Sequence, residues 1–418
     1  ACATPARRVI VAGVGPGRPG VGGGVDEVFL DVVGAHKPGK PEPLYAITDK
    51  PDVTMLPPPR FDLLKMDAYA AMSVQFSRGC PFQCEFCDII VLYGRKPRTK
   101  SPGQLLAELD RMRALGWKGE VFLVDDNFIG NQVKARELLS ELERWQQRHN
   151  FPLAFYTEAS VNLAQRVELI EQMVRANFHY VFLGIETPSA ESLHETRKLQ
   201  NLKGSLVDAV HTILDQGLWV MGGFIVGFDA DDESIFERQR EFIELAAIPW
   251  AMVGMLQAPP KTALFQRLEQ EGRLLPDGTG DNLSLPNFRT IIPRKKMVEQ
   301  YCWLIDQLYS PQAYFQRALR SLRLWRTHKP QVPPKRPLKF SLQGFFGGLW
   351  ALGVKSPFRA TFWRSLLELV RMAWNNPTKM HHGFSVLLTG LHMVTYAHTV
   401  TEGYRAMEIE DDPVPVPC

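Results

Sequence analysis

Short apolar runs alternate with amphipathic stretches over residues 70–258. The apolar runs have the length of strands, and the stretches between them repeat apolar residues at the spacing of one helix face. Ser101 and Asn162 are expected to begin helices, and Gly116 and Gly217 are expected to end them. The pattern predicts strands at 71–76, 121–124, 153–156, 180–185, 220–226 and 251–256, and helices at 102–115, 133–148, 163–176, 205–217 and 234–246.

Six strand–helix units in succession predict parallel strands joined by crossover helices, which is an α/β fold. Six units are too few to close a barrel of eight strands, so either an open barrel or a doubly wound sheet is expected. In both folds ligands bind at the carboxyl ends of the strands. Polar residues that follow the apolar runs are therefore the first candidates for a functional site.

The regions on either side of this core have other patterns. Residues 1–58 are rich in Gly and Pro, with one candidate strand at 9–14. The spacing GVGPGRPGVGGG matches no phosphate-binding loop and no amphipathic helix follows it, so a linker or domain remnant is expected rather than a nucleotide site. Residues 260–325 have a helical, charged pattern, and a proline-rich linker at 329–337 precedes an aromatic, basic tail.

The composition is typical of a globular protein, since 45% of the 418 residues are hydrophobic and 22% are charged. The formal net charge is only +3, so the overall charge does not indicate nucleic acid as a partner. No apolar run reaches the roughly 18–20 residues needed to cross a bilayer. Three of the six cysteines lie close together, which indicates a metal site in a reducing compartment, so a cytoplasmic protein is expected.

Cys80, Cys84 and Cys87 follow directly after the first predicted strand, in SRGCPFQCEFCDII. Three thiolates are one fewer than the four ligands of a closed structural zinc site. On a 4Fe–4S cluster, three thiolates leave one iron open to a small molecule. The spacing therefore favours an iron–sulfur cluster with a chemical function, and a zinc site completed by a remote residue is the alternative.

The C-x3-C-x2-C loop after the first strand resembles that of the radical S-adenosylmethionine (SAM) superfamily, over residues 70–258. The resemblance implies a partial (β/α)6 TIM-type barrel with a C-terminal helical extension. It also implies that SAM binds the open iron, and that an electron from the cluster cleaves SAM to a 5′-deoxyadenosyl radical. A small electron carrier such as flavodoxin or ferredoxin would be the donor.

The same resemblance implies which residues bind SAM. The backbone of Phe86 would contact the adenine, and a glycine motif on the fifth strand would lie beside it. Asp125 would stand where the family holds the SAM amino group with a Gly-Gly-Glu segment, whose glycines this chain lacks. Polar groups after the third and fourth strands would bind the methionyl carboxylate or the ribose, although Glu186 is equally a candidate helix cap. The full set is Phe86, Asp125, Asp126, Asn127, Glu158, Ser160, Glu186, Gly223, Ile225, Gly227 and Gln257.

Longer stretches resemble the cobalamin-binding radical SAM proteins that include hopanoid C-2 methylases, among them PRFDLLKMDAY, FLGIETPSAESL and MVGMLQAPPKTALFQRLEQEGRLL. This resemblance implies methylation of an unactivated carbon on a small-molecule or lipid substrate, with methylcobalamin as methyl donor. Such a C–H bond has no acidity for a general base to use, so a radical is required. Cobalamin-independent radical chemistry and a non-catalytic, cluster-bearing scaffold are the alternatives.

The expected organisation follows from these resemblances. Residues 1–58 are too short for a cobalamin domain and contain no Asp-x-His-x-x-Gly pattern, so we expect a domain remnant or linker there. The radical SAM core is expected at 59–258, a helical extension at 259–330 and a basic, aromatic-rich helical tail at 331–418. This chain alone is expected to bind cobalamin weakly or not at all.

The segment 316–380 is unusually basic, with thirteen Lys or Arg and a single acid, Glu368. Arginines such as Arg317 are interleaved with aromatics such as Trp325 and Phe362. This mixture suits the headgroup layer of a membrane and predicts a peripheral contact, while packing of the aromatics on the core is the alternative.

The remaining cysteine and histidine candidates have structural interpretations. Cys302 is expected to be a buried structural thiol. His381, His382, His392 and His398 are expected on a helix face or at the surface, with a second metal site as the alternative.

Overall fold

The computed structural model describes the chain except for residues 1–19, 23–43, 47–49, 276–283, 328–337 and 410–418. The predicted strand at 9–14 and most of the glycine-rich segment lie outside the described residues. Within the N-terminal region, β1 (Gly20–Gly22) and β2 (Leu44–Ala46) form a parallel pair, and three short 3-10 helices follow: η1 (Val53–Met55), η2 (Phe61–Leu63) and η3 (Met66–Ala68).

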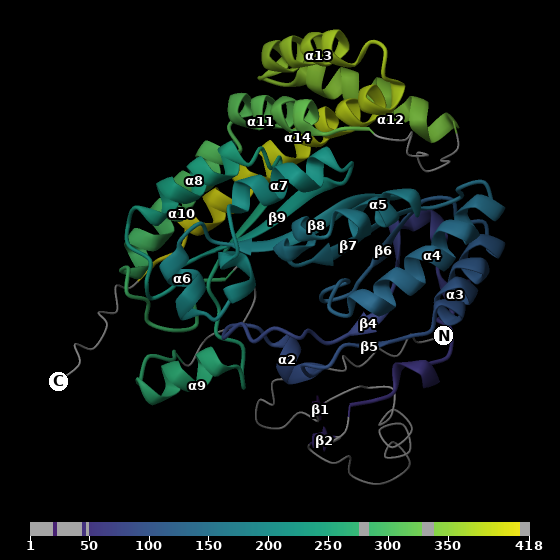
Figure 1. Ribbon diagram of the computed structural model, residues 1–418. Coiled ribbons are helices and arrows are strands. Elements are labelled where there is room, and N and C mark those ends of the chain that lie inside the picture. Colours follow the sequence, from purple (N-terminus) through teal and green to yellow (C-terminus); the bar gives the residue numbers. More distant parts are fainter. Residues whose placement is uncertain (1–19, 23–43, 47–49, 276–283, 328–337, 410–418) are drawn as a thin grey trace, which may run out of the picture.

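A six-stranded parallel sheet forms the centre of the molecule, in the order β10-β9-β8-β7-β6-β3 (Figure 1). Each strand pairs with the one that precedes it in this series along the chain, as successive right-handed crossovers require. The prediction of a partial barrel built from six strand–helix units is confirmed. The strands are β3 (Ala71–Val74), β6 (Glu120–Leu123), β7 (Ala154–Ala159), β8 (Phe178–Glu186), β9 (Trp219–Val226) and β10 (Trp250–Met255).

Helices between the strands cover one face of this sheet. Identifiable capping residues and glycines determine where several of these helices begin and end. Ser101 begins α3 with a reciprocal capping box to Gln104. Gly116 and Gly217 end helices at φ +91° and +100°, where glycine is unstrained, so both predicted stops are confirmed. The helices are α3 (Pro102–Ala114), α4 (Gln132–Arg148), α5 (Val167–Arg175), α6 (Ala190–Glu195), α7 (Leu206–Asp215) and α8 (Ile235–Leu245).

One predicted helix start is wrong. Asn162 lies inside a short 3-10 helix, η4 (Val161–Gln165), and α5 begins only after Arg166. The side chain of Asn162 accepts a hydrogen bond from the Ser160 hydroxyl at 2.5 Å instead of capping a helix. Asn residues often make such local contacts, which compete with helix formation.

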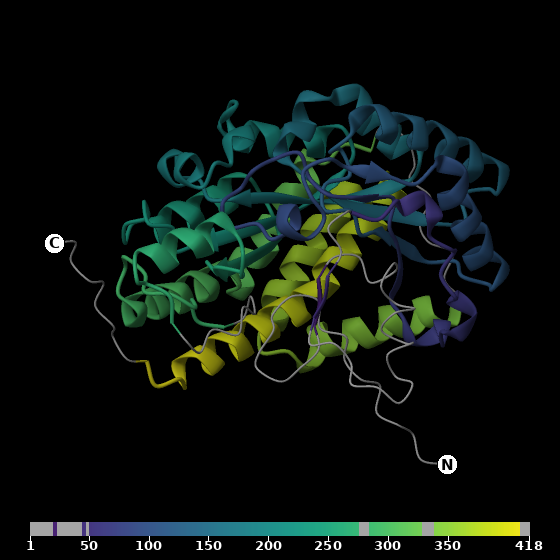
Figure 2. The ribbon, with the colours of Figure 1, turned by 90° about the horizontal axis from the view of Figure 1, so that it is seen from below.

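The C-terminal helices pack together across residue 330. The long helix α14 contacts α10, α11 and α13, and it runs obliquely across the molecule in Figure 2. Among the described residues, no helix combines the length and the apolar character that crossing a membrane requires. The helices are α9 (Ala263–Gln270), α10 (Arg294–Leu308), α11 (Pro311–Leu324), α12 (Leu338–Trp350), the π-helix η6 (Ala351–Lys355), α13 (Arg359–Ala373) and α14 (Pro377–Arg405).

Three residues expected at a membrane surface are buried instead. Trp325 and Phe362 belong to the hydrophobic core. Arg317 has no exposed surface, and its guanidinium donates to the carbonyls of Ile248 at 2.8 Å and Leu308 at 2.7 Å while pairing with Glu244. The guanidinium is therefore satisfied inside the fold, as a buried charge must be.

The two faces of the sheet differ in burial. Alternate strand residues such as Val121 and Leu183 are fully buried with residues of the covering helices. The other set is only partly covered, and Met252 keeps 66% of its surface exposed. We call this second set the inner face, and in a partial barrel it lines the space beneath the ligand-binding edge.

His382 closes the amino-terminal end of the inner face. Its ring lies 4.4 Å from that of Trp219 and 4.7 Å from that of Trp325, and it is buried. His382 therefore lies on a helix face, as expected, but on the face of α14 that packs against the sheet and not at the surface. Its Nε2 has no hydrogen-bond partner among the described residues.

We predict that His382→Phe makes the protein less sensitive to acid. Burial lowers the pKa of His382 to about 3, so the unfolded chain binds more protons below pH 6.5 and the free energy of unfolding falls with falling pH. Phenylalanine fits the aromatic surroundings and does not titrate. Between pH 7.5 and 5 the variant should lose about 2 kcal/mol less stability than the wild type, measured by urea unfolding.

The comparison must be made between the two proteins, because buried acids act in the opposite direction. Burial raises the pKa of Asp125 and of Asp231 to about 6, and these groups favour folding as the pH falls. They are the same in both proteins and cancel in the difference. Parallel losses in the variant and the wild type would contradict the assignment.

Candidate functional site

The three clustered cysteines lie in a loop that leaves the carboxyl end of β3 and is closed by a small ribbon. β4 (Ser77–Arg78) pairs antiparallel with β5 (Arg98–Thr99), and α2 (Ile89–Leu92) lies between them. Gly79, at φ +98°, leaves no room for a side chain, since a Cβ would stand 2.7 Å from the Gly94 carbonyl oxygen. The same carbonyl accepts a hydrogen bond from the Cys80 amide at 3.3 Å. The loop therefore enters the site in a defined conformation.

Carboxylates after β6 hold the start of this loop. Asp125 accepts from the amides of Phe76 at 2.7 Å and Ser77 at 2.9 Å, and Asp126 accepts from the amide of Gly79 at 3.0 Å. Asp125 is almost fully buried and both its oxygens are engaged. The geometry thus gives Asp125 a positioning function for the cysteine loop, which the Gly-Gly-Glu analogy did not predict.

Side-chain amides surround the thiols. Asn127 directs its Nδ2 to the Cys80 sulfur at 3.8 Å and to the Ser160 hydroxyl at 3.1 Å, and Gln200 directs its Nε2 to the Cys84 sulfur at 3.7 Å. Such donors stabilise the negative sulfur atoms of a bound cluster and tune its potential. The donor set and its surroundings therefore fit an iron–sulfur cluster.

The Cys80 and Cys87 thiols carry protons until a metal displaces them. Burial raises the pKa of the Cys87 thiol to about 12 and also raises that of Cys80. A coordinated thiol is deprotonated outright, so loading of a cluster would release protons here. In the described residues, no group of three or more His, Cys, Asp or Glu side chains converges on the position of a single metal ion.

Glu186 forms a buried ion pair with Lys198 at the end of β8. The strand register shifts after Gly184, and Glu186 adopts φ +67°, a strained value for a residue with a side chain. The cap of α6 is instead Ser189, whose hydroxyl accepts from the Ser192 amide at 3.3 Å. The helix-cap interpretation of Glu186 is therefore wrong.

Lys198 brings a positive charge to the cysteines. It is only 8% exposed, and its Nζ lies 5.9 Å from the centre of the Phe86 ring. Burial alone would lower the pKa of Lys198, but the charge of the Glu186 carboxylate outweighs burial and raises it. The ammonium therefore keeps its charge inside the site.

Glu158 gives the site a carboxyl group that titrates near neutrality. Burial, together with the negative charges of Asp126 and Asp125, raises its pKa to about 7. A cationic ligand placed beside Glu158 would favour its ionised form. Perturbed carboxyl groups at the carboxyl ends of parallel strands are typical of functional sites.

On the other side of the cysteines, an apolar wall forms beneath the loop. Phe86 packs with Phe228 at 5.9 Å between ring centres, and Ile225 joins the same small core. Gln257 follows β10 and donates through Nε2 to the Ser284 carbonyl at 3.1 Å. Its buried Oε1 has no hydrogen-bond partner among the described residues, so it can accept one from a ligand.

Gly223, in β9, and Gly227, just after it, are glycines for two different structural reasons. A Cβ on Gly223 would lie 2.8 Å from the Phe182 ring. Gly227 adopts φ +101°, and its amide donates to the Asp231 carboxylate at 2.9 Å. The first glycine makes room for an aromatic ring on the inner face, and the second allows the turn after β9.

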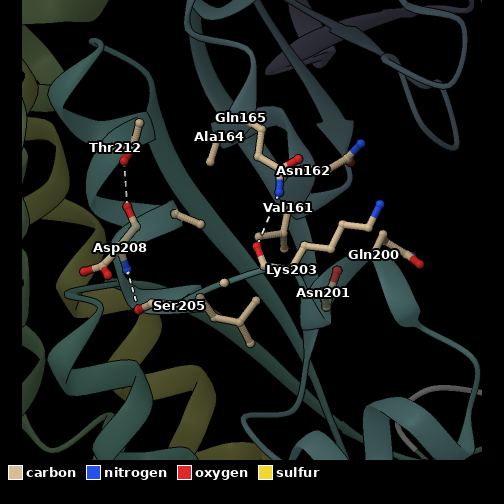
Figure 3. Close-up of a pocket in the computed structure, with 13 residues that line it drawn as sticks. Val161, Asn162, Ala164, Gln165, Gln200, Asn201, Lys203, Ser205, Asp208 and Thr212 are labelled. Carbon is tan, nitrogen blue, oxygen red and sulfur yellow. Dashed lines mark hydrogen bonds between the residues drawn. The ribbon is translucent and has the colours of Figure 1, made fainter.

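A pocket of about 190 Å³ lies next to this site, between η4, η5 (Leu199–Leu202) and α7 (Figure 3). Asn162, Gln200 and Asn201 line it on the side of η4 and η5, and Ser205 and Asp208 line it at the start of α7. Gln200 connects the two spaces, because it lines the pocket and also contacts Cys84.

The structure therefore gathers the predicted residues at one edge of the sheet and adds others. Lys198, Gln200 and Asn201 were not predicted, because they follow α6 and carry no strand-end pattern. Arg267 of α9 was also missed, although it binds Glu85 of the cysteine loop at 2.8 Å. Such contacts join segments far apart in the chain and leave no local pattern.

Two family models match the chain. Residues 74–243 match the radical SAM superfamily, and residues 262–406 match a domain of unknown function, DUF4070. The second match spans residue 330, in agreement with the packing of α14 against α10 and α11.

Several proteins resemble the chain over most of its length. An uncharacterized methyltransferase of Synechocystis, sll1242, is 45% identical over 91% of this chain and 72% of its own length. The hopanoid C-2 methylase of Rhodopseudomonas palustris is 34% identical over 87% of this chain and 68% of its own length. Among solved structures, the cobalamin-dependent SAM radical enzyme OxsB, with aqua-cobalamin and SAM bound, has a TM-score of 0.50 at 14% identity. That match covers 88% of this chain and 60% of OxsB, and it supports the fold.

Proposed function

This chain belongs to the radical SAM superfamily, whose members use a 4Fe–4S cluster and SAM, and we propose that it is a methyltransferase acting on an apolar, hopanoid-like lipid. The two relatives that match most of this chain, sll1242 and the hopanoid C-2 methylase, are named as a methyltransferase and a methylase. The observation that carries the substrate class is the apolar inner face of the sheet beneath the cysteine loop.

The inner face offers broad apolar contacts. The rings of Phe122 and Tyr156 stack at 4.6 Å with an interplanar angle of 2°. Phe182 and Met221 are register partners on the next two strands, and Met252 of β10 is largely exposed. A fused-ring hydrocarbon would bury these apolar side chains, and the polar residues Ser73 and Glu120 of the same face lie on β3 and β6, at one side of the sheet.

Cys80, Cys84 and Cys87 would hold the cluster. When bound, the cluster supplies the electron that cleaves SAM to methionine and a 5′-deoxyadenosyl radical. The Lys198–Glu186 pair presents both charges needed to bind the zwitterionic methionyl group of SAM, and Glu158 offers a further carboxylate to its ammonium.

The apolar wall would bind the adenosyl group. Phe86 and Ile225 would flank the adenine, and the unpaired Oε1 of Gln257 would accept its exocyclic amine. Gly223 and Gly227 would lie beside the adenine at the end of this strand. Asp126, Asn127 and Ser160 would act through the cysteine loop and its thiol contacts.

Cobalamin would supply the methyl group. OxsB is a cobalamin-dependent enzyme with a similar fold, and the chain spans 60% of its length. We propose that the chain acts in hopanoid biosynthesis in the cytoplasm with a flavodoxin or ferredoxin donor. A cobalamin-independent radical reaction is the second candidate.

Hydrogen abstraction tests this function without a need for cobalamin. The anaerobically loaded protein, with SAM, a strong reductant and a perdeuterated pentacyclic triterpene, should release 5′-deoxyadenosine that contains deuterium. Met252→Glu should abolish the deuterium transfer but keep SAM cleavage, because it places a charge on the inner face. The matched control, Leu245→Glu, changes an exposed residue of α8 outside the barrel. A loaded protein that forms no 5′-deoxyadenosine would indicate a scaffold, and equal transfer by Met252→Glu would contradict the substrate site.

A further inference from the structure

An unusual number of large apolar side chains are exposed on two consecutive C-terminal helices. Phe346, Trp350 and Val354 recur every fourth residue along α12 and η6. Trp363 and Leu367 begin a second outward stripe on α13, which Arg371 and Trp374 continue. We call Phe346, Trp350, Val354, Trp363, Leu367 and Trp374 the tryptophan face.

These exposed positions belong to well-packed helices. Phe362, Leu369 and Ala373 bury the opposite side of α13, and Phe345 of α12 packs on Phe384 of α14 at 4.8 Å between ring centres. The indole of Trp363 donates to the Gly353 carbonyl at 2.9 Å and so joins the two helices. Trp350 and Trp374 nevertheless keep 56% and 76% of their surface exposed. Contiguous exposed aromatics of this kind mark an interaction surface.

The charges around the tryptophan face have one sign. Lys355, Arg359, Arg364 and Arg371 are exposed beside it. The one acid of this region, Glu368, pairs with Arg323 of α11. A basic, aromatic surface complements an anionic headgroup layer, in which indole rings bury at the interface and cations meet lipid phosphates. An isologous contact between two copies would instead bring these cations against one another.

We propose that the tryptophan face docks this protein on the surface of an anionic lipid bilayer. The contact is interfacial, in keeping with the helices of the described residues, none of which is long and apolar enough to span a membrane. In Figure 1, α12 and α13 lie at the opposite end of the molecule from α2 and α9, which flank the cysteine loop. Docking therefore leaves the cysteine loop free for an electron donor.

Vesicle flotation of the full chain tests the proposal. The protein should float with vesicles of phosphatidylglycerol and phosphatidylcholine, and should not float with phosphatidylcholine alone or at high salt. Trp350→Ser/Trp374→Ser should lower the floated fraction at least tenfold. Arg364→Gln and Arg371→Gln should each weaken binding about fivefold. The matched controls, Val133→Ser/Leu245→Ser and Arg144→Gln, change residues of similar exposure elsewhere and should float like the wild type.

Two outcomes would overturn the proposal. The first is equal flotation of the tryptophan variants and the wild type, or none by either. The second is a wild-type dimer that Trp350→Ser/Trp374→Ser converts to a monomer in light scattering, which would make the face a contact between copies. SAM cleavage should be unchanged in these variants, so failure of docking and failure of the proposed chemistry are distinguishable.

Discussion

Cys84→Ala should reduce the iron content of the anaerobically loaded protein from about four atoms per chain to nearly none. The wild type should be brown, with the broad visible absorption of an iron–sulfur cluster, and the variant should be colourless. The reason is that Cys84 lies between the other two ligands and its sulfur is buried beside the Gln200 amide, so no neighbouring donor can replace it. Iron analysis and visible absorption measure the result.

Cys302→Ala is the matched control for this loss of iron. Cys302 is also buried, but its sulfur faces the Thr401 carbonyl at 3.8 Å between α10 and α14. This variant should be less stable by about 1–2 kcal/mol and should keep its iron. A wild-type protein that holds one zinc and shows no iron–sulfur absorption would refute the cluster, as would Cys84→Ala with its iron intact.

Lys198→Met should destabilise the protein by about 3–5 kcal/mol, because it leaves the buried Glu186 carboxylate without its partner. In the loaded protein it should also lower the midpoint potential of the cluster. A nearby cation favours the reduced, more negative state, and the Lys198 charge acts on Cys84 and Cys87. Urea unfolding measures the first effect, and a redox titration followed by electron paramagnetic resonance measures the second.

A double variant separates the two functions of Lys198. Glu186→Gln/Lys198→Met removes both charges and should recover much of the stability, but the affinity for SAM should remain low. Lys203→Met, which changes an exposed lysine at the other end of η5, should alter neither stability nor potential. An unchanged potential in Lys198→Met would show that its charge is structural only.

The cysteine site and the tryptophan face lie at opposite ends of one fold. The carboxyl ends of the strands carry the cysteines and the charged groups, and α12 and α13 carry the tryptophan face (Figure 1). His382 packs on Trp219 at the amino-terminal end of the inner face. Variants at one end should therefore leave the readout of the other end unchanged, since well-separated sites are generally independent.

The sequence by itself determined the six strand–helix units, because periodic burial and glycine stops are local properties of the chain. It also determined that the three proposed cysteine ligands lie within a single loop, because their spacing is local, and it predicted most of the polar residues that lie at the strand ends. It misplaced the start of α5, where the Ser160–Asn162 contact decides the backbone.

Only the tertiary structure decided which polar groups face which. It assigned Asp125 to the loop amides, paired Glu186 with Lys198, and buried Arg317 and His382, because each of these contacts joins residues many positions apart or on different elements. It likewise divided the aromatic, basic segment into core residues and the tryptophan face. Composition alone could not make that division, since burial of a helix side depends on what packs against it.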